Sequence, residues 1–283
     1  MIGLLGLGLG TASRLPTALV QPYSRHLDNG ILLVYPDLAM IDFYTMITPL
    51  YGLPSLSPPC LKLETWFRIA EVPYRALPAP SLDQAPKGKI PFIEYKGERM
   101  GDSTLIIDML KKREGIDLDG DLSATERAIS VAFRRMIKEN IYWAVIDVRY
   151  RVEENWQKYR HVLASALAPG AAEEQWAPAI DGLRQVIVDQ MWGHGIGRHN
   201  SDETAIIHIA DFNAISDLLA DKPFLMGDRP TTVDAAAYSY IGNLVRPPYE
   251  NKVTEHVKSL DNLMRYWDRM TDQYFPEVRD GGD

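Results

Sequence analysis

The stretch GKIPFIEYKGERMGDS, residues 88–103, is the most informative part of the chain because it joins a β-hairpin directly to a helix. Two runs of strand-forming residues flank Lys96-Gly97, a turn signal that is weaker than Asn-Gly. Ile90-Pro91 precedes the first run. Asp102-Ser103 follows the second and is typical of the N-cap of a helix. The stretch therefore predicts two antiparallel strands followed at once by a helix.

The residues before this stretch predict a strand, a helix and a second strand. Asp42–Thr48 is β-branched and aromatic on both faces, which is typical of a short strand in a sheet covered on two sides. Residues 61–71 place apolar side chains at i, i+3, i+4 and i+7, the pattern of an amphipathic helix with one buried stripe. Pro73 ends this pattern, and Tyr74–Leu77 is expected to be a strand parallel to the first, since such crossovers are right-handed.

After Gly115 the strand signals stop, and the rest of the chain is predicted to be helical. The first helix opens with the capping box Ser123–Glu126 and is expected to run to about Trp156. Further helices are predicted over residues 173–191, 202–219, 231–244 and 253–273. This order predicts an α/β domain over residues 41–116 and an all-helical domain over residues 122–275.

Length and composition favour a compact protein of two domains, since the chain has 283 residues of which 46% are hydrophobic. Charged residues make up 24% and aromatic residues 10%, which excludes disordered and collagen-like chains. The net charge of -8 repels phosphate backbones and anionic lipid, so no nucleic-acid partner is expected. Cys60 is the single cysteine, so the chain forms no internal disulfide and needs no oxidising compartment.

Neither end of the sequence carries a predicted membrane or export signal. Residues 1–13 are apolar but too short to span a bilayer, and they lack the basic flank of a secretory signal. We interpret residues 1–40 as an extension outside the core, with a translation start at Met40 or Met46 as the alternative. The polar residues 271–283 predict that no integral membrane anchor is present there, and a cytoplasmic location is expected.

Histidine and glycine patterns in the C-terminal half predict no metal or dinucleotide site. His194, His199 and His208 lack the spacing of a compact ligand pair, and no cysteine lies near them in the sequence. The glycines of residues 193–197 follow no strand and have the wrong spacing for a dinucleotide-binding loop. We interpret them as a flexible turn between two helices.

The order of elements, with Ile90-Pro91 before the hairpin and Asp102-Ser103 at the helix start, resembles the cytosolic glutathione transferase superfamily over about residues 41–275. The resemblance implies a fold of the α/β plus all-α class, with a thioredoxin-like N-terminal domain followed by an all-helical glutathione transferase C-terminal domain. It also implies a homodimer in which the N-terminal domain of one subunit meets the helical domain of the other.

Three local motifs sharpen this resemblance. Residues 57–65, SPPCLKLET, are similar to the first helix start of the failed-axon-connections and metaxin branch. Residues 195–199, GIGRH, resemble a stretch of bacterial members of that branch. Residues 223–234, PFLMGDRPTTVD, resemble the superfamily's characteristic helix start, in which Thr231 and Asp234 fit a capping box with a structural role.

The resemblance implies glutathione as co-substrate, and the residues around Ile90-Pro91 are candidates for binding it. If this bond is cis, the backbone of Ile90 turns outward and pairs with the extended peptide as an added strand. Lys89 and Lys87 are candidates for binding the glycyl carboxylate. The alternatives are that Pro91 only begins a strand and that both lysines are solvated surface residues.

Asp102-Ser103 is the candidate site for the γ-glutamyl end of glutathione. The Ser103 hydroxyl and the free amides of a helix N-terminus suit a carboxylate, and the Asp102 side chain suits the neighbouring ammonium. The alternative is a plain N-cap, and the two interpretations are compatible because a cap can also bind a ligand.

Ser57 and Cys60 are the candidate catalytic residues. Superfamily members place a Tyr, Ser or Cys near the first helix start, and Ser57 holds that place, capping the helix ahead of Pro58. Its hydroxyl is expected to donate a hydrogen bond to the glutathione thiolate and favour ionisation. Cys60 takes the second, resolving position of a C-x-x-C spacing, with a buried small hydrophobe as its alternative role. Tyr51 and Ser55 are alternatives to Ser57.

Tyr142, Trp143 and Tyr150 are candidates for a pocket that binds a second substrate, because the resemblance puts the middle of the long helix beside the glutathione thiol. Packing in the core is the equal alternative. The leading function is a glutathione transferase that acts on a small hydrophobic electrophile. The alternatives are a metaxin-like protein-binding module without turnover, and a glutathione-dependent thiol reductase that works through Cys60.

Overall fold

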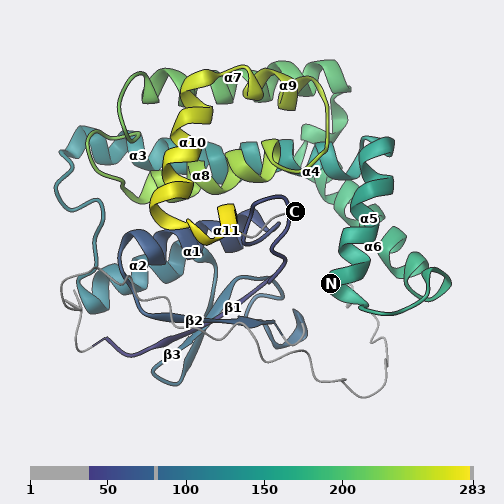
Figure 1. Ribbon diagram of the computed structural model, residues 1–283, viewed down its shortest axis with the longest axis horizontal. Coiled ribbons are helices and arrows are strands. Elements are labelled where there is room, and N and C mark those ends of the chain that lie inside the picture. The colour runs from purple at the N-terminus through teal and green to yellow at the C-terminus, as the bar shows by residue number, and fades with distance from the viewer. Residues whose placement is uncertain (1–37, 80–81, 281–283) are drawn as a thin grey trace.

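The computed structural model describes residues 38–79 and 82–280. Of the extension predicted for residues 1–40, only residues 38–40 belong to this part of the chain. The described residues form a small sheet, two helices that cover one of its faces, and a larger group of helices beyond them (Figure 1).

The sheet contains β1 (Ile41–Thr45), β2 (Tyr74–Pro78), β3 (Phe92–Tyr95) and β4 (Glu98–Gly101) in the order β2-β1-β3-β4. β1 and β2 are parallel, with Phe43 opposite Ala76, which confirms the predicted crossover. β3 runs antiparallel to β1 and to β4, and the β3–β4 pair is the predicted hairpin. The sheet places the end of β1 near the start of the hairpin, where the candidate residues lie.

Two helices, α1 (Pro58–Ile69) and α2 (Ser103–Glu114), lie on one face of this sheet (Figure 1). They share a core with the inward side chains of β1, among them Ile41 and Phe43. The sequence predicts a sheet covered on both faces, whereas Asp42 and Tyr44 on the other face of β1 are partly exposed. Asp42 pairs there with Arg75 and Tyr44 stacks on Phe92, so neither side chain needs a covering helix.

The helical part is built around α8, all of whose residues are buried. Its elements are α3 (Ala124–Arg135), a π-helical turn (Met136–Ile141), α4 (Tyr142–Tyr150), α5 (Glu153–Leu167), α6 (Glu173–His194), α7 (Ser201–Leu219), α8 (Thr232–Val245), α9 (Lys252–Lys258), α10 (Asp261–Tyr274) and α11 (Glu277–Asp280). Short 3-10 turns occur at Leu82–Gln84 and Ile196–Arg198. The capping box predicted for the first of these helices is present, because the Ser123 amide donates to Glu126 and the Ser123 hydroxyl accepts from the Glu126 amide.

Two of the helices predicted from the sequence are each divided into shorter helices in the structure. The first is expected to reach about Trp156, but α4 ends at Tyr150 and the extended Val152 precedes α5. The helix expected over residues 253–273 divides into α9 and α10, because Leu260 leaves the helical conformation with ψ 87°. A single non-helical residue does not interrupt a periodic pattern of apolar side chains, which is why the pattern joins these helices.

Buried polar contacts from the helical part hold the loop that leads into α1. Arg149, which is only 1% exposed, donates to the Leu56 carbonyl at 2.7 Å and to the Asn243 side chain at 2.8 Å. The Asn243 amide donates to the Ser55 carbonyl at 3.3 Å. The position of the first helix start therefore depends on α4 and α8 as well as on its own sequence.

Candidate functional site

Ser57 lies at the start of α1, as the sequence predicts, but its hydroxyl does not cap the helix. Ser57 is the N-cap by its extended backbone, and its carbonyl accepts the Leu61 amide at 2.9 Å. A capping hydroxyl accepts from the second or third helical amide, and the second residue here is Pro59, which has none. The predicted N-cap position of Ser57, with Pro58 as the first helical residue, is therefore confirmed, but its hydroxyl makes no capping bond and instead lies near the Cys60 thiol.

Cys60 points into the core between α1 and the sheet, where it is fully buried. Burial raises the pKa of its thiol, although the neighbouring hydroxyls of Ser57 and Thr45 act in the opposite direction. A buried thiol with a raised pKa is a poor nucleophile, because the thiolate is the reactive form. The geometry therefore favours the prediction that Cys60 is shielded.

The two alternatives to Ser57 have other partners. The Ser55 hydroxyl is buried, donates to the Met46 carbonyl at 2.7 Å and accepts the Ser57 amide at 3.2 Å. Tyr51 packs edge-on against the ring of Tyr249. Of the three candidates, Ser57 is the partly exposed one whose hydroxyl is next to Cys60 at the helix start.

The Ile90-Pro91 peptide bond is cis, which confirms the prediction for this bond. Pro91 is buried and Ile90 is partly exposed. Lys87 and Lys89 are both exposed, and the alkyl chain of Lys87 runs beside Gly101, 3.6 Å from where a Cβ of that glycine would lie. Both lysines therefore lie on the surface near the hairpin. Their contacts with the glycyl carboxylate stay a prediction.

Asp102 is the N-cap of α2, and both of its carboxylate oxygens have partners within the chain. One carboxylate oxygen accepts the amides of Thr104 at 2.8 Å and Leu105 at 3.4 Å. The other pairs with the ammonium of Lys138, at 3.1 Å, from the π-helical turn of the helical part. Burial acts to raise the pKa of Asp102, but the contact with Lys138 and the Thr104 amide together lower it. Asp102 is therefore ionised, and its neighbour Ser103 is buried at the same helix start.

Lys62 is a residue that the sequence pattern does not single out. It is only 3% exposed, and its ammonium donates to the Thr104 hydroxyl at 3.3 Å. Burial and the positive charge of Lys138 lower the pKa of Lys62 to about 8. The burial of Lys62 could in principle have been predicted, because a helix packed between a sheet and a second layer of helices also buries its polar face. The structure shows this for α1, which is buried continuously from Cys60 to Arg68.

The three aromatic candidates of α4 separate in the structure. Tyr150 is buried in the core, with its ring against Trp156 and Tyr159, so the core alternative applies to it. Tyr142 and Trp143 are partly exposed and contact each other edge-on at a ring distance of 5.0 Å. These two remain candidates for contact with a second substrate.

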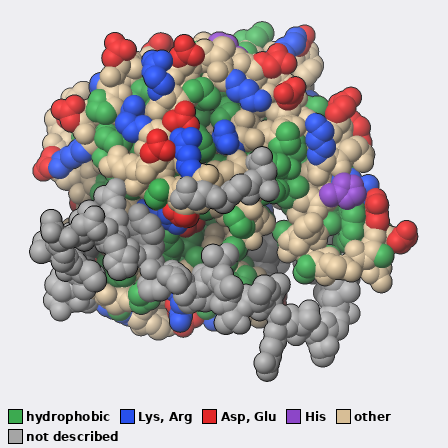
Figure 2. All heavy atoms as spheres, viewed as in Figure 1, with side chains coloured by type: hydrophobic (Ala, Val, Ile, Leu, Met, Phe, Trp, Pro, Cys, Tyr) green, Lys and Arg blue, Asp and Glu red, His purple; other side chains and the backbone are tan. Residues whose placement is uncertain are grey.

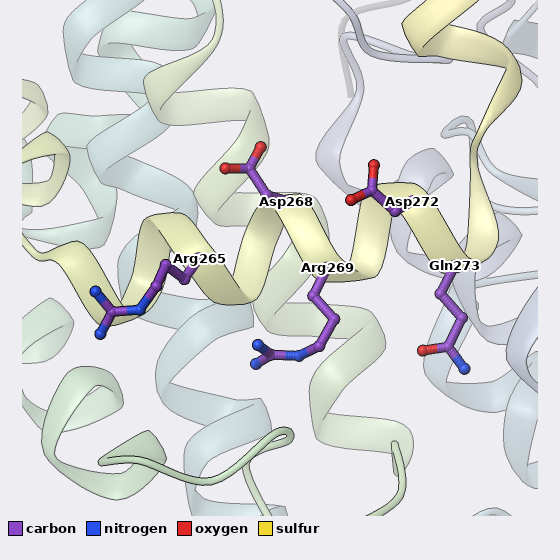
Figure 3. A pocket seen from close by; sticks show the side chains of 5 residues that line it. All are labelled: Arg265, Asp268, Arg269, Asp272 and Gln273. Atoms are coloured by element: carbon purple, nitrogen blue, oxygen red, sulfur yellow. The ribbon is translucent and has the colours of Figure 1, made fainter.

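Other features of the described surface do not point to a ligand. Figure 2 shows acidic and basic side chains interspersed on the visible face rather than gathered in one patch. A hollow along α10 is lined by residues of that helix alone (Figure 3). There Asp268 and Asp272 pair with Arg279, and Arg269 donates to the Pro223 carbonyl. Three of the four charged side chains that line this hollow therefore have partners within the chain.

The described residues contain neither a cluster of metal-ligating side chains nor a helix that could cross a membrane. No group of three or more His, Cys, Asp and Glu side chains in residues 38–79 and 82–280 is arranged to hold a metal ion. Within the same residues, every helix is too short or too polar to span a membrane.

Comparison of the sequence with protein families gives two matches. The model described as the glutathione S-transferase N-terminal domain matches residues 58–156, and the one described as the glutathione S-transferase C-terminal domain matches residues 209–270. The isoprene-epoxide glutathione S-transferase of Rhodococcus sp. (strain AD45) is 33% identical over 83% of this chain and 99% of that protein. Failed axon connections of Drosophila melanogaster is 31% identical over 81% of this chain, which spans 56% of that longer protein.

More distant relatives and solved structures agree with this pattern. Human metaxin-1 is 25% identical over 80% of this chain and 49% of its own length. A glutathione transferase from Phanerochaete chrysosporium superposes with a TM-score of 0.57 at 18% identity, covering 84% of this chain and 98% of that one. Glutathione S-transferase III superposes with a TM-score of 0.53 at 16% identity, covering 86% and 97%. The predicted fold, a thioredoxin-like domain followed by a helical domain, is confirmed.

Proposed function

Because the chain belongs to the glutathione S-transferase superfamily, we propose that it binds glutathione in its N-terminal domain and joins the thiol to a small hydrophobic electrophile. The observation that carries the proposal is the 33% identity to an isoprene-epoxide glutathione S-transferase, since this chain spans 99% of that enzyme. An epoxide is therefore the class of electrophile to test first.

Ser57 is the proposed catalytic residue. Ser57 is partly exposed, and its hydroxyl does not cap α1 but lies within hydrogen-bonding reach of the buried Cys60 thiol. A neutral thiol can donate to this hydroxyl, which leaves the hydroxyl proton for a hydrogen bond to a bound thiolate. Such a bond stabilises the anion and lowers the pKa of the thiol. The thiolate sulfur then attacks a ring carbon of the epoxide, so that a carbon–sulfur bond forms and the carbon–oxygen bond breaks. The resulting alkoxide takes up one proton, which balances the proton that the thiol released. Close placement of the two reactants supplies the rest of the acceleration.

The proposed glutathione site lies between the hairpin and α2. The Ile90 backbone beside cis-Pro91 pairs with the peptide, Lys89 binds the glycyl end, and the helix start at Asp102 and Ser103 binds the γ-glutamyl end. Tyr142 and Trp143 are the proposed contacts of the electrophile. We also propose a cytoplasmic homodimer, and a monomer mass by light scattering at micromolar concentration would contradict the dimer.

Isothermal titration of the full chain with glutathione is the direct test. Saturable binding with a dissociation constant at or below the millimolar range is expected, and no heat at millimolar glutathione would overturn the proposal. Incubation with glutathione and a small alkene epoxide is expected to give the thioether adduct, detected by mass spectrometry.

A binding module without turnover is the second candidate function, favoured by the similarity to failed axon connections and the metaxins. Glutathione binding without an adduct from any of a panel of epoxides and alkyl halides would support it. The thiol-reductase alternative is disfavoured because Cys60 is fully buried and its pKa is raised.

A further inference from the structure

The part of the proposed site that would bind the γ-glutamyl end, called here the γ-glutamyl corner, is formed by the start of α2 at Asp102 and Ser103 with Lys62 and Lys138 beside it. It contains more positive than negative charge. Lys62 and Lys138 both approach the start of α2, where Asp102 pairs with Lys138 at 3.1 Å and Glu139 lies 3.8 Å from the same ammonium. The nearby Arg134 and Arg135 face their own acidic partners, Asp119 at 4.0 Å and Glu139 at 3.7 Å. The corner therefore has a positive charge without a matching anion among the described residues.

Lys62 carries that unmatched charge. An ammonium has three hydrogen-bond donors, and the one bond that the structure gives Lys62 is to the neutral Thr104 hydroxyl, at a long 3.3 Å. Lys62 is 3% exposed, so water replaces few of the missing bonds. Asp102 is close enough to act on the charge of Lys62 but makes its ion pair with Lys138. A carboxylate of a ligand would complete the bonding of Lys62.

Asp102, in contrast, already has an ammonium partner within the chain. One of its oxygens accepts two backbone amides, and the other is taken by Lys138. A ligand ammonium beside Asp102 would be repelled by the positive charges of Lys138 and Lys62. Lys138 therefore supplies, from the helical part of the same chain, the positive charge that Asp102 would otherwise take from an α-ammonium.

We propose that this corner recognises the α-carboxylate of the γ-glutamyl end through Lys62 and does not use the α-ammonium. The inference rests on the proposed function, and it adds the ligand class: thiol peptides whose acyl end bears a free carboxylate, with or without an amino group beside it. Lys62 is the specificity residue, and Lys138 makes the site indifferent to the ammonium by neutralising Asp102.

Titration of the full chain with three peptides tests this inference. The peptides are glutathione, 4-carboxybutanoyl-Cys-Gly, which lacks the ammonium, and 4-aminobutanoyl-Cys-Gly, which lacks the carboxylate. We expect the first analogue to bind within about threefold of glutathione and the second to bind about tenfold or more weakly, as for loss of a charged hydrogen bond. A tenfold loss with the first analogue and none with the second would overturn the inference.

Two variants separate the roles of the lysines. In Lys62→Met the preference for the carboxylate is expected to fall below about threefold, and Lys62→Gln gives the same readout if the Met variant does not fold. In Lys138→Met, Asp102 loses its partner, and the analogue without the ammonium is expected to bind more weakly than glutathione. Lys112→Met, on the exposed side of α2, is the matched control and should retain the wild-type order of the three peptides.

The outcomes distinguish the inference from the proposed function. If glutathione binds but Lys62→Met keeps the wild-type preference for the carboxylate, the inference is wrong and the proposed function stands. If none of the three peptides binds at millimolar concentration, both are wrong.

Discussion

Lys62 and Asp234 are both buried charged residues where the two parts of the chain meet, but their surroundings differ. Asp234 is 0% exposed and accepts from the Leu225 amide at 2.8 Å, from the Thr231 amide at 2.8 Å and from the Thr231 hydroxyl at 2.9 Å, with Tyr266 donating at 3.2 Å. Lys62 is almost as buried and has one hydrogen bond, to a neutral hydroxyl at 3.3 Å. One charge is saturated with partners, and the other is not.

The difference separates a structural charge from a functional one. A buried charge costs free energy unless hydrogen bonds and opposite charges replace its water. Asp234 has these partners, so its removal should lower the free energy of unfolding. Lys62 lacks them in the chain itself, so its cost to the fold is compensated when a ligand supplies the missing anion.

The largest effect is expected from Asp234→Ala. Removal of the carboxylate leaves the Leu225 and Thr231 amides buried without partners, so the free energy of unfolding should fall by about 3–5 kcal/mol. Urea denaturation followed by circular dichroism measures this change. The matched control is Glu126→Ala in the exposed capping box of α3, where a loss of about 1 kcal/mol is expected. Equal losses in the two variants would remove the distinction between a buried and an exposed box.

The second effect is the pH dependence of stability that Lys62 causes. Its pKa falls from 10.5 to about 8 on folding, so between these values the unfolded chain binds more protons than the folded one. The free energy of unfolding therefore rises with pH from about 8 until tyrosines of the unfolded chain ionise near pH 10. At about 1.4 kcal/mol per pKa unit, the full contribution is roughly 3 kcal/mol.

Lys62→Met tests this second effect, because it removes the buried charge and keeps the length of the side chain. The variant should be at least as stable as the wild type at pH 7, and its stability should lose the rise above pH 8. Lys252→Met, which removes an exposed lysine paired with Asp202, should keep the rise. Urea melts at pH 7, 8, 9 and 10 give the comparison, and a variant less stable than the wild type at pH 7 would show that Lys62 is structural.

The same contrast applies to two hydroxyls and predicts the third effect. Ser55 is saturated by Met46 and by the Ser57 amide, whereas the Ser57 hydroxyl does not cap its helix. Ser57→Ala is therefore expected to lower turnover by about tenfold or more with little change in stability, as for loss of one donor to a developing anion. Ser55→Ala should do the reverse, lowering stability by about 1 kcal/mol or more. Steady-state kinetics with an epoxide and thermal melts of both variants decide the matter.

The smallest effect is expected from Cys60→Ser. The thiol is fully buried, and its pKa is raised by burial, so conjugation should stay within about twofold of the wild type. Cys60→Ala controls for the new hydroxyl in the core. Loss of activity in both cysteine variants, with Ser57→Ala still active, would identify a thiol-based reductase instead.

Local sequence predicts much of the fold because each element carries its own signal. The Lys96-Gly97 turn between two strand-forming runs predicts the hairpin, and Ser123–Glu126 predicts a helix start, as the structure shows. The ends of helices are predicted less well. Arg151 and the extended Val152 separate α4 from α5, and so short an interruption leaves no mark in a periodic pattern of apolar residues.

The sequence by itself determined the order of elements, the Thr231–Asp234 capping box and the candidates around Ser57, Ile90-Pro91 and Asp102, since all of these depend on neighbouring residues. The tertiary structure alone decided which of the polar side chains near these positions are paired within the chain and which are buried with few partners. Lys138 reaches Asp102 from 36 positions along the chain, and Lys62 is buried because α1 lies between the sheet and α8. Contacts between distant segments set burial, and burial sets the cost of an unpaired charge, so no local pattern contains this information.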